Sequence, residues 1–174
     1  MNREIAHAAL MALLLAAAGC ASSAAKVDAA TDAGDAAADA LDGGACNAIA
    51  QLADPVTTSC DPGSPPAAAG GTIVDGTYVM TESHFFGACE SNVLSETLVI
   101  SQETVHSITT DATTGMAMRR SFTIKVTSGS STLSETETCP GAFIANIGFT
   151  ATPSRLTIFM RNALGSRMSA FELQ

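Results

Sequence analysis

The sequence predicts an all-β domain of about eight short antiparallel strands in meander order. From Thr72 onward the chain is rich in β-branched residues, which favour extended strands. Glycine, proline, asparagine and aspartate break this region at intervals of about ten residues, as turns between strands do. No comparable helical periodicity occurs there. Short strands that follow one another in this way are typical of a small closed barrel or of a sandwich.

The strand pattern recurs in successive segments of the domain. The clearest alternation places Phe122, Ile124 and Val126 on one face of a strand and Thr123 and Lys125 on the other. Such an alternation predicts a strand with one buried face. The predicted strands are, in chain order, Gly76–Phe86, Val93–Ser101, Glu103–Thr110, Met116–Thr127, Thr132–Thr138, Phe143–Ala151, Arg155–Arg161 and Met168–Leu173.

The segment that precedes the strands has a different composition. Cys46–Leu52 is long enough for one helical turn, and Asp54-Pro55 would end that turn because a residue before proline disfavours the helix. The run Cys60–Pro66 is rich in proline and glycine, which disfavours regular structure. We therefore expect a turn-rich lead-in to the strands.

The first twenty residues have the pattern of a secretory signal that ends at a cysteine. Arg3 gives a positively charged start, and Ile5–Ala18 is rich in alanine, leucine and methionine. The densest apolar part has the length of a signal-peptide core and is too short to span a bilayer. Ala17-Ala18-Gly19-Cys20 resembles the bacterial lipobox, although the family usually has leucine at the position of Ala17.

The lipobox resemblance implies that Cys20 receives a lipid and anchors the mature chain in a membrane. By analogy with enterobacterial sorting, Ala21 after the cysteine implies the outer membrane of a Gram-negative bacterium. The alternative is an ordinary signal that is cleaved near Ala18 and leaves Cys20 as a free thiol.

Four parts of the chain follow from these patterns: a signal peptide (1–19), the acylated cysteine with an acidic Ala/Asp-rich linker (20–44), a disulfide-bearing Pro/Gly-rich lead-in (45–70) and the β domain (71–174). The linker cannot bury an apolar face, so we expect a disordered tether. The spacing of its aspartates is also compatible with an alanine-rich helical spacer.

The formal net charge of the chain is −9, with 8 lysines and arginines. An acidic domain without a basic stripe argues against nucleic-acid binding, which depends on phosphate contacts.

Four cysteines remain beside Cys20: Cys46, Cys60, Cys89 and Cys139. An even number in an exported domain predicts two disulfides. Three pairings are possible, and we favour Cys46–Cys60 with Cys89–Cys139, because the first pair encloses a turn-rich segment beside the core. A zinc site is disfavoured because no C-x-x-C spacing occurs and the histidines do not cluster with the cysteines.

The first long strand opens with Gly76-Thr77-Tyr78, and further strands follow without an intervening helix. This layout resembles the lipocalin-like barrels, whose families often begin with Gly-x-Trp, with Tyr78 here at the position of the tryptophan. The resemblance covers about 71–174 and implies a binding role, since an eight-stranded barrel holds side chains or one small ligand. In a hollow barrel, a small apolar ligand would contact large side chains such as Tyr78, Met80, Phe122, Phe143 and Phe149. In a filled barrel these side chains would form the core.

Two groups of residues offer a possible chemistry. Strand alternation places Glu82 and His84 on the face of Tyr78 and Met80, where a general base or a metal ligand is one interpretation and a half-exposed strand histidine is the favoured one. His106, near Glu103, has the same two interpretations.

Glu135 and Glu137 share one side of a strand, and a cation or glycoside site is the alternative to a solvated edge. The sequence contains no nucleophile elbow, phosphate-binding loop or dinucleotide fingerprint.

The sequence thus predicts a lipid-anchored envelope protein without enzymatic activity, catalytic residues, cofactor or metal. We expect it to bind a small apolar ligand in its β domain. The alternative is a structural or protein-interaction lipoprotein of the envelope, with a filled core and an envelope protein as its partner.

Overall fold

The computed structural model describes residues 46–89 and 91–174 of the chain. These residues form ten strands and no helix. Within this part, no helix is long and apolar enough to span a bilayer. The predicted signal peptide, Cys20 and the acidic linker lie outside the described residues.

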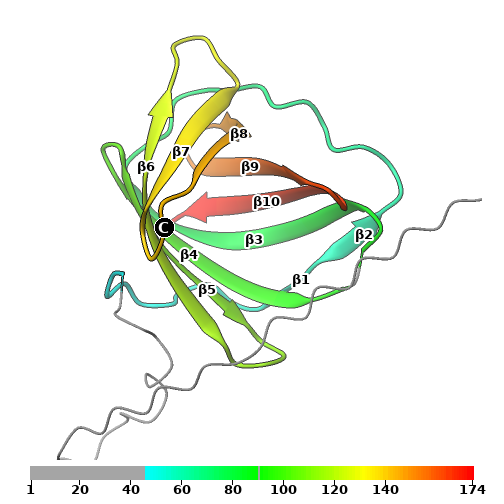
Figure 1. Ribbon diagram of the computed structural model, residues 1–174. Coiled ribbons are helices and arrows are strands. Elements are labelled where there is room, and N and C mark those ends of the chain that lie inside the picture. The colour runs from blue at the N-terminus through cyan, green and yellow to red at the C-terminus, as the bar shows by residue number, and fades with distance from the viewer. Residues whose placement is uncertain (1–45, 90) are drawn as a thin grey trace, which may run out of the picture. The chain divides into compact units, whose positions relative to one another are not determined.

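Eight strands close into a barrel (Figure 1), which confirms the predicted all-β fold. Each strand pairs antiparallel with the next, and β3 closes the ring by pairing with both β10 and β4. Every predicted segment corresponds to one of these strands, with boundaries shifted by a few residues at most. The barrel strands are β3 (Gly76–Gly87), β4 (Val93–Ser101), β5 (Thr104–Asp111), β6 (Ala117–Val126), β7 (Thr132–Cys139), β8 (Ile144–Ala151), β9 (Arg155–Asn162) and β10 (Gly165–Leu173).

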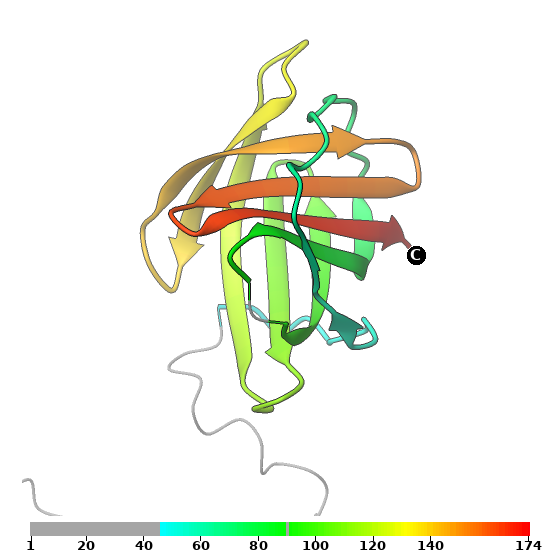
Figure 2. The same cartoon turned by 90° about the vertical axis from the view of Figure 1, so that its right-hand side faces the viewer.

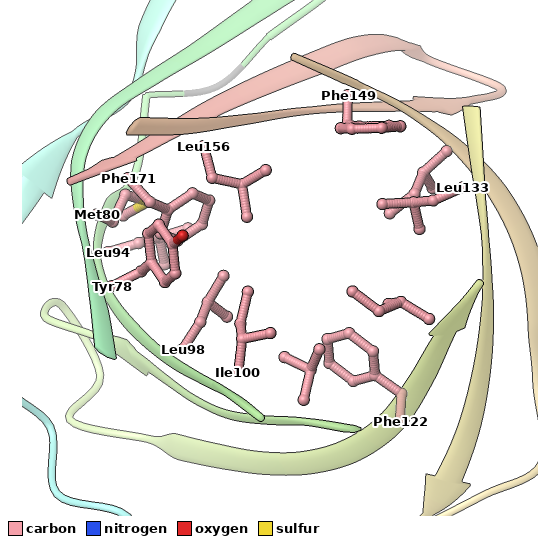
Figure 3. Packing of buried hydrophobic residues seen from close by; sticks show 13 residues of the cluster. Tyr78, Met80, Leu94, Leu98, Ile100, Phe122, Leu133, Phe149, Leu156 and Phe171 are labelled. Carbon is pink, nitrogen blue, oxygen red and sulfur yellow. The ribbon is translucent and has the colours of Figure 1, made fainter. Parts of the chain in front are cut away.

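Apolar side chains fill one half of the barrel. Figure 3 shows them pointing from the strands toward the barrel axis. Phe149 on β8 and Phe171 on β10 are 0% and 1% exposed. Burial of such side chains contributes about 1.5–3 kcal/mol each. The cluster comprises Tyr78, Met80, Leu94, Leu98, Ile100, Val105, Phe122, Ile124, Leu133, Ile147, Phe149, Leu156 and Phe171.

The lead-in closes the barrel at the filled half. The Gly70 amide donates to the Phe149 carbonyl, and the Gly70 carbonyl accepts from the Ala151 amide, both at 2.8 Å. Gly71 has a positive φ of 128°, and a Cβ there would lie 2.2 Å from the Ala151 carbonyl oxygen, so only glycine fits. Ile73 then packs against the apolar cluster. We call this the closed end; it includes the C-terminus on the right of Figure 2.

Residues 46–61, which we call the strap, cross the outer face of the barrel. The Asn47 amide donates to the carbonyls of Ser107 on β5 and Arg120 on β6. The Gln51 amide donates to the carbonyls of Ser95 on β4 and Ile108 on β5. The predicted helical turn at 46–52 is therefore wrong: the segment contains no helix, and its Asn47 and Gln51 amides bond to backbone carbonyls of the barrel wall.

The strap ends in two short strands that the composition did not predict. β1 (Val56–Thr57) pairs antiparallel with β4, and β2 (Ser59–Asp61) pairs parallel with β3. They fill the gap where β3 and β4 diverge, because β3 and β4 pair only from Gly76–Val79 to Thr97–Ile100.

Two disulfides form, as predicted, but their pairing differs. Cys46 bonds to Cys139 and Cys60 bonds to Cys89, with Cα–Cα distances of 5.4 and 5.8 Å. The favoured pairing is wrong because the strap is extended, so its two cysteines lie at opposite ends and each reaches a different barrel loop. Both partners lie toward the end of the barrel opposite the closed end, which we call the open end.

A β-bulge reverses the side-chain alternation within β3. Phe171 lies opposite Met80 and Ala170 lies opposite Glu82, so β3 carries one extra residue at Thr81. Before the bulge Met80 points into the barrel, whereas after it Ser83 is buried and Glu82 and His84 are on the outer face. The expectation that Glu82 and His84 share the face of Met80 is therefore wrong.

Candidate functional site: a cavity at the open end of the barrel

The open half of the barrel contains a cavity of about 830 Å³. It is bounded by the ends of β3 and β6–β10 together with the β3–β4, β7–β8 and β9–β10 connections, because antiparallel strands bring these loops to one end. A volume of this size accommodates a small organic ligand. The lining residues are Thr58, Phe85, Ala88, Cys89, Asn92, Arg120, Glu135, Phe143, Ala145, Asn146, Ile147, Met160, Arg161, Asn162, Leu164 and Arg167.

Two seams of the barrel are weakly paired toward this end. The β3–β4 seam is filled by the strap, as described above. At the second seam, β8 pairs with β9 only from Gly148 to Ala151, so the preceding half of β8 leaves β9. Asn146 of β8 and Arg161 of β9 both line the cavity there. The cavity therefore extends to a slit between β8 and β9 as well as to the mouth of the barrel.

Arg120 on β6 forms an ion-pair cluster with two glutamates of β7 in the cavity wall. Its Nη2 lies 2.8 Å from Glu135 Oε1 and 2.6 Å from Glu137 Oε2, and its Nε donates to Glu137. The two glutamate side chains are 8% and 12% exposed. The expected solvated edge is wrong, because β7 lies between β6 and β8 and turns this pair inward.

Two carboxyl groups within the barrel have raised pKa values. Burial raises the pKa of Glu135, and the neighbouring Arg120 partly opposes this rise. Burial also raises the pKa of Glu96 on β4, against the attraction of Arg167 and Arg120. Both carboxyls therefore hold a proton more readily than exposed glutamates, which limits the net negative charge inside the barrel.

Arg167 on β10 brings a second guanidinium to the cavity. Its Nη2 lies 3.8 Å from the sulfur of Met80, whereas its Nε is buried and has no hydrogen-bond partner among the described residues. Ser169, two residues further along the strand and 1% exposed, has a buried hydroxyl in the same condition. A buried polar group without a partner costs about 1–3 kcal/mol. An acceptor atom of a ligand would remove that cost at Arg167.

The five predicted ligand-contact residues fall into two groups. Tyr78, Met80, Phe122 and Phe149 belong to the packed apolar cluster, and the Tyr78 hydroxyl donates to the Val74 carbonyl at the closed end. Burial raises the pKa of this hydroxyl. Phe143 instead lines the cavity and is 57% exposed.

Glu135 was considered in the sequence analysis, but its partner Arg120 and a further cavity arginine, Arg167, were missed, although the spacing contained a signal for Arg120. Arg120 is in phase with Phe122 and Ile124, and Glu135 is in phase with Leu133. A charge at a buried position of an alternating strand usually has a partner or a function. That rule points to the cluster of Arg120 and Glu135.

The outer face carries a separate polar cluster around His84. Its Nδ1 lies 2.7 Å from Ser59 Oγ and 2.9 Å from Asp61 Oδ2, and its Nε2 lies 3.9 Å from Glu82. In a catalytic triad the serine and the carboxylate bind opposite ring nitrogens, whereas here both contact Nδ1. The hydrogen bond from His84 lowers the pKa of Asp61. The arrangement is that of a hydrogen-bonded surface cluster that joins β2 to β3.

The second histidine is not brought to the first. His106 lies on β5, separated from β3 by β4, and its Nδ1 is 2.8 Å from Ser121 Oγ. Across the described residues, no group of three or more histidine, cysteine, aspartate or glutamate side chains is placed to hold a metal ion.

Comparisons of this chain with protein-family models, curated proteins and solved structures gave no match.

Proposed function

We propose that the protein is an exported, lipid-anchored binding protein that holds one small amphipathic molecule in the open half of its barrel, without catalysing a reaction. The observation that carries the proposal is a cavity lined by both apolar and polar side chains, with a buried arginine Nε that has no partner among the described residues. Ligand pockets typically combine apolar surface with a few polar groups that fix orientation.

The chemistry of the cavity indicates the kind of ligand. Phe85, Phe143, Ile147 and Met160 offer apolar contacts to a hydrocarbon body. Arg120 is neutralised by Glu135 and Glu137. Of the other two lining arginines, Arg161 and Arg167, we assign the polar head to Arg167, because its buried Nε has no partner among the described residues. A carboxylate or another head with acceptor oxygens matches a guanidinium best. The ligand class is therefore an apolar molecule with an oxygen-bearing head, such as a medium-length fatty acid.

Binding is tested with two fluorescent probes that share one acyl chain, a fatty acid and the corresponding fatty alcohol. The purified chain should take up both. Arg167→Met should weaken binding of the acid by about tenfold or more, because a charge-assisted hydrogen bond is lost. Binding of the alcohol should change much less. Fluorescence titration gives both dissociation constants.

Two further variants locate the probe. Ala145→Trp places a large ring at a cavity-lining position and should block uptake of both probes. Arg155→Met removes an arginine of the outer face that pairs with Glu82 and Glu172, and should leave uptake unchanged. Failure of either probe to bind, or full uptake by Ala145→Trp, would contradict the proposed cavity function.

Anchoring is a separate part of the proposal and rests on the lipobox-like Ala17-Ala18-Gly19-Cys20. Stable attachment needs more than one acyl chain, which a diacylglyceryl group provides. Mass spectrometry of the mature chain should find a lipid on Cys20, and Cys20→Ser should release the protein from the membrane fraction. An unmodified Cys20 thiol in the mature chain would contradict this part alone.

A further inference from the structure

Large apolar side chains are exposed on the loops at the open end of the barrel. We call them the apolar rim; they are Met116 and Met118 at the β5–β6 turn, Phe143 and Ile144 at the β7–β8 loop, and Leu164 in the β9–β10 turn. Ile144 and Leu164 are each 70% exposed, and Phe143 is 57% exposed. These connections all lie at one end because β5 to β10 alternate in direction. The β7–β8 loop and the β9–β10 turn lie on the left of Figure 2.

The rim also borders the cavity. Phe143 and Leu164 line it, and they stand on the two sides of the slit between β8 and β9. Whatever covers the rim therefore also covers the route by which a ligand enters. Exposed apolar patches of this kind mark contacts with a protein or a membrane.

The point of chain attachment favours a membrane. Cys46 is bonded to Cys139, and Cys139 is the last residue of β7, immediately before the β7–β8 loop. The chain that leads back to Cys20 thus joins the domain beside the rim. If Cys20 carries the proposed lipid, the anchored chain enters the described domain at Cys46, beside the rim, and not at the closed end.

The charges near the rim are compatible with a lipid surface. The β7–β8 connection from Pro140 to Phe143 and the β9–β10 turn from Ala163 to Gly165 contain no acidic residue. In the β5–β6 turn, Asp111 accepts hydrogen bonds from the backbone amides of Thr113 and Thr114, which lower its pKa. The Asp111 carboxylate therefore stays ionised and bonded to the backbone of the turn, while Met116 is 68% exposed.

We propose that the apolar rim docks on the surface of a lipid bilayer, with the mouth and the slit facing the headgroups, so that an amphipathic ligand passes between the membrane and the cavity. The passage of a ligand between membrane and cavity rests on the proposed ligand binding. The docking itself rests on the exposed rim and on the attachment of Cys46 beside it.

The test uses the chain from residue 20 onward with Cys20→Ser, so that neither a lipid anchor nor the apolar run Ile5–Ala18 contributes. Partition onto phosphatidylcholine vesicles is measured by flotation without ligand. The Cys20→Ser chain should bind, and adding Ile144→Glu and Leu164→Glu should lower the partition coefficient by about tenfold or more, because two apolar side chains lose their contact with lipid.

Leu52→Glu is the control, with one new charge on an exposed leucine outside the rim. Leu52 is 60% exposed on the strap, away from the loops of the open end. This variant should bind vesicles as well as the Cys20→Ser chain does, and circular dichroism and urea unfolding should show that all three chains fold. Equal partition of the rim variant and the Leu52 variant would overturn the proposal. The proposal would also be overturned if the Cys20→Ser chain did not bind vesicles and instead formed a dimer in sedimentation that the rim substitutions abolish. That result would show that a second copy covers the rim.

Discussion

Arg120 Nη2 lies 2.6 Å from Glu137 Oε2 and 2.8 Å from Glu135 Oε1, within a barrel whose other half is apolar. One guanidinium thus holds two carboxyl groups of the same strand. The three side chains are at most 25% exposed. A charge removed from such a cluster leaves its partners poorly solvated, which is costly.

Arg120→Met should lower the free energy of unfolding by about 3–5 kcal/mol, since it leaves two largely buried carboxyls without their cation. The loss should be larger at pH 8 than at pH 4.5, because burial raises the pKa of Glu135 and a protonated Glu135 needs no cation. Urea unfolding at the two pH values measures both effects. Arg155→Met, which breaks the half-exposed pairs with Glu82 and Glu172, should cost below about 1 kcal/mol. Equal costs for the two variants would contradict this account.

Glu96→Gln should change the pH dependence of stability. Burial raises the pKa of Glu96 above its ordinary value of 4.5, so the folded state binds its proton more tightly than the unfolded state does. The stabilisation of the folded state by proton binding at Glu96 is therefore fully present below pH 4.5, and it is lost as the pH rises through the raised pKa.

The glutamine variant lacks that loss, so it should gain stability relative to the parent between pH 4 and pH 8. The gain amounts to about 1.4 kcal/mol for each unit by which the pKa is raised. Parallel urea titrations of parent and variant measure it, and identical pH profiles would exclude a raised pKa at Glu96.

The two disulfides should contribute unequally to stability. Cys46 and Cys139 are 93 residues apart and Cys60 and Cys89 are 29 apart. Loop-closure entropy then gives about 4.7 and about 3.6 kcal/mol. Replacing each pair by serine should lower the free energy of unfolding in that order. Peptide mapping of the oxidised protein checks the pairing directly, and a Cys46–Cys60 peptide would refute it.

Truncation should distinguish the packed half of the barrel from the open half. Phe149→Ala should cost about 3–5 kcal/mol, because the side chain is fully buried and leaves a cavity. Phe143→Ala should cost far less, because Phe143 is 57% exposed at the rim. Thermal unfolding of both variants gives the comparison. A similar loss for both would mean that Phe143 belongs to the packed core.

The barrel strands were predictable because each is a local pattern. β-branched residues, an alternation such as that of Phe122 and Ile124, and glycine-bearing turns mark a strand without knowledge of its neighbours. The order of pairing follows, since short turns connect consecutive strands.

The features that depend on distant partners were not predictable in this way. The bulge at Thr81 exists only in the register between β3 and β10, and it turns Glu82 and His84 outward. A second register shift, between Ser121 and Phe122, leaves Thr138 as the extra residue of β7 and places Cys139 opposite Ser121. The Ser121 hydroxyl donates to the Cys46 carbonyl of the strap on the outer face, so this shift directs Cys139 toward Cys46.

At the mouth of the barrel, strand pairing is interrupted at two places, between β3 and β4 and between β8 and β9. Between β3 and β4 the strap bridges the interruption, and the disulfides Cys46–Cys139 and Cys60–Cys89 attach its two ends to the barrel. At the β8–β9 break the described residues provide no such fastening. We therefore expect the mouth of the oxidised protein to open only on the side of β8 and β9, and reduction of the disulfides to let it open on the side of β3 and β4 as well.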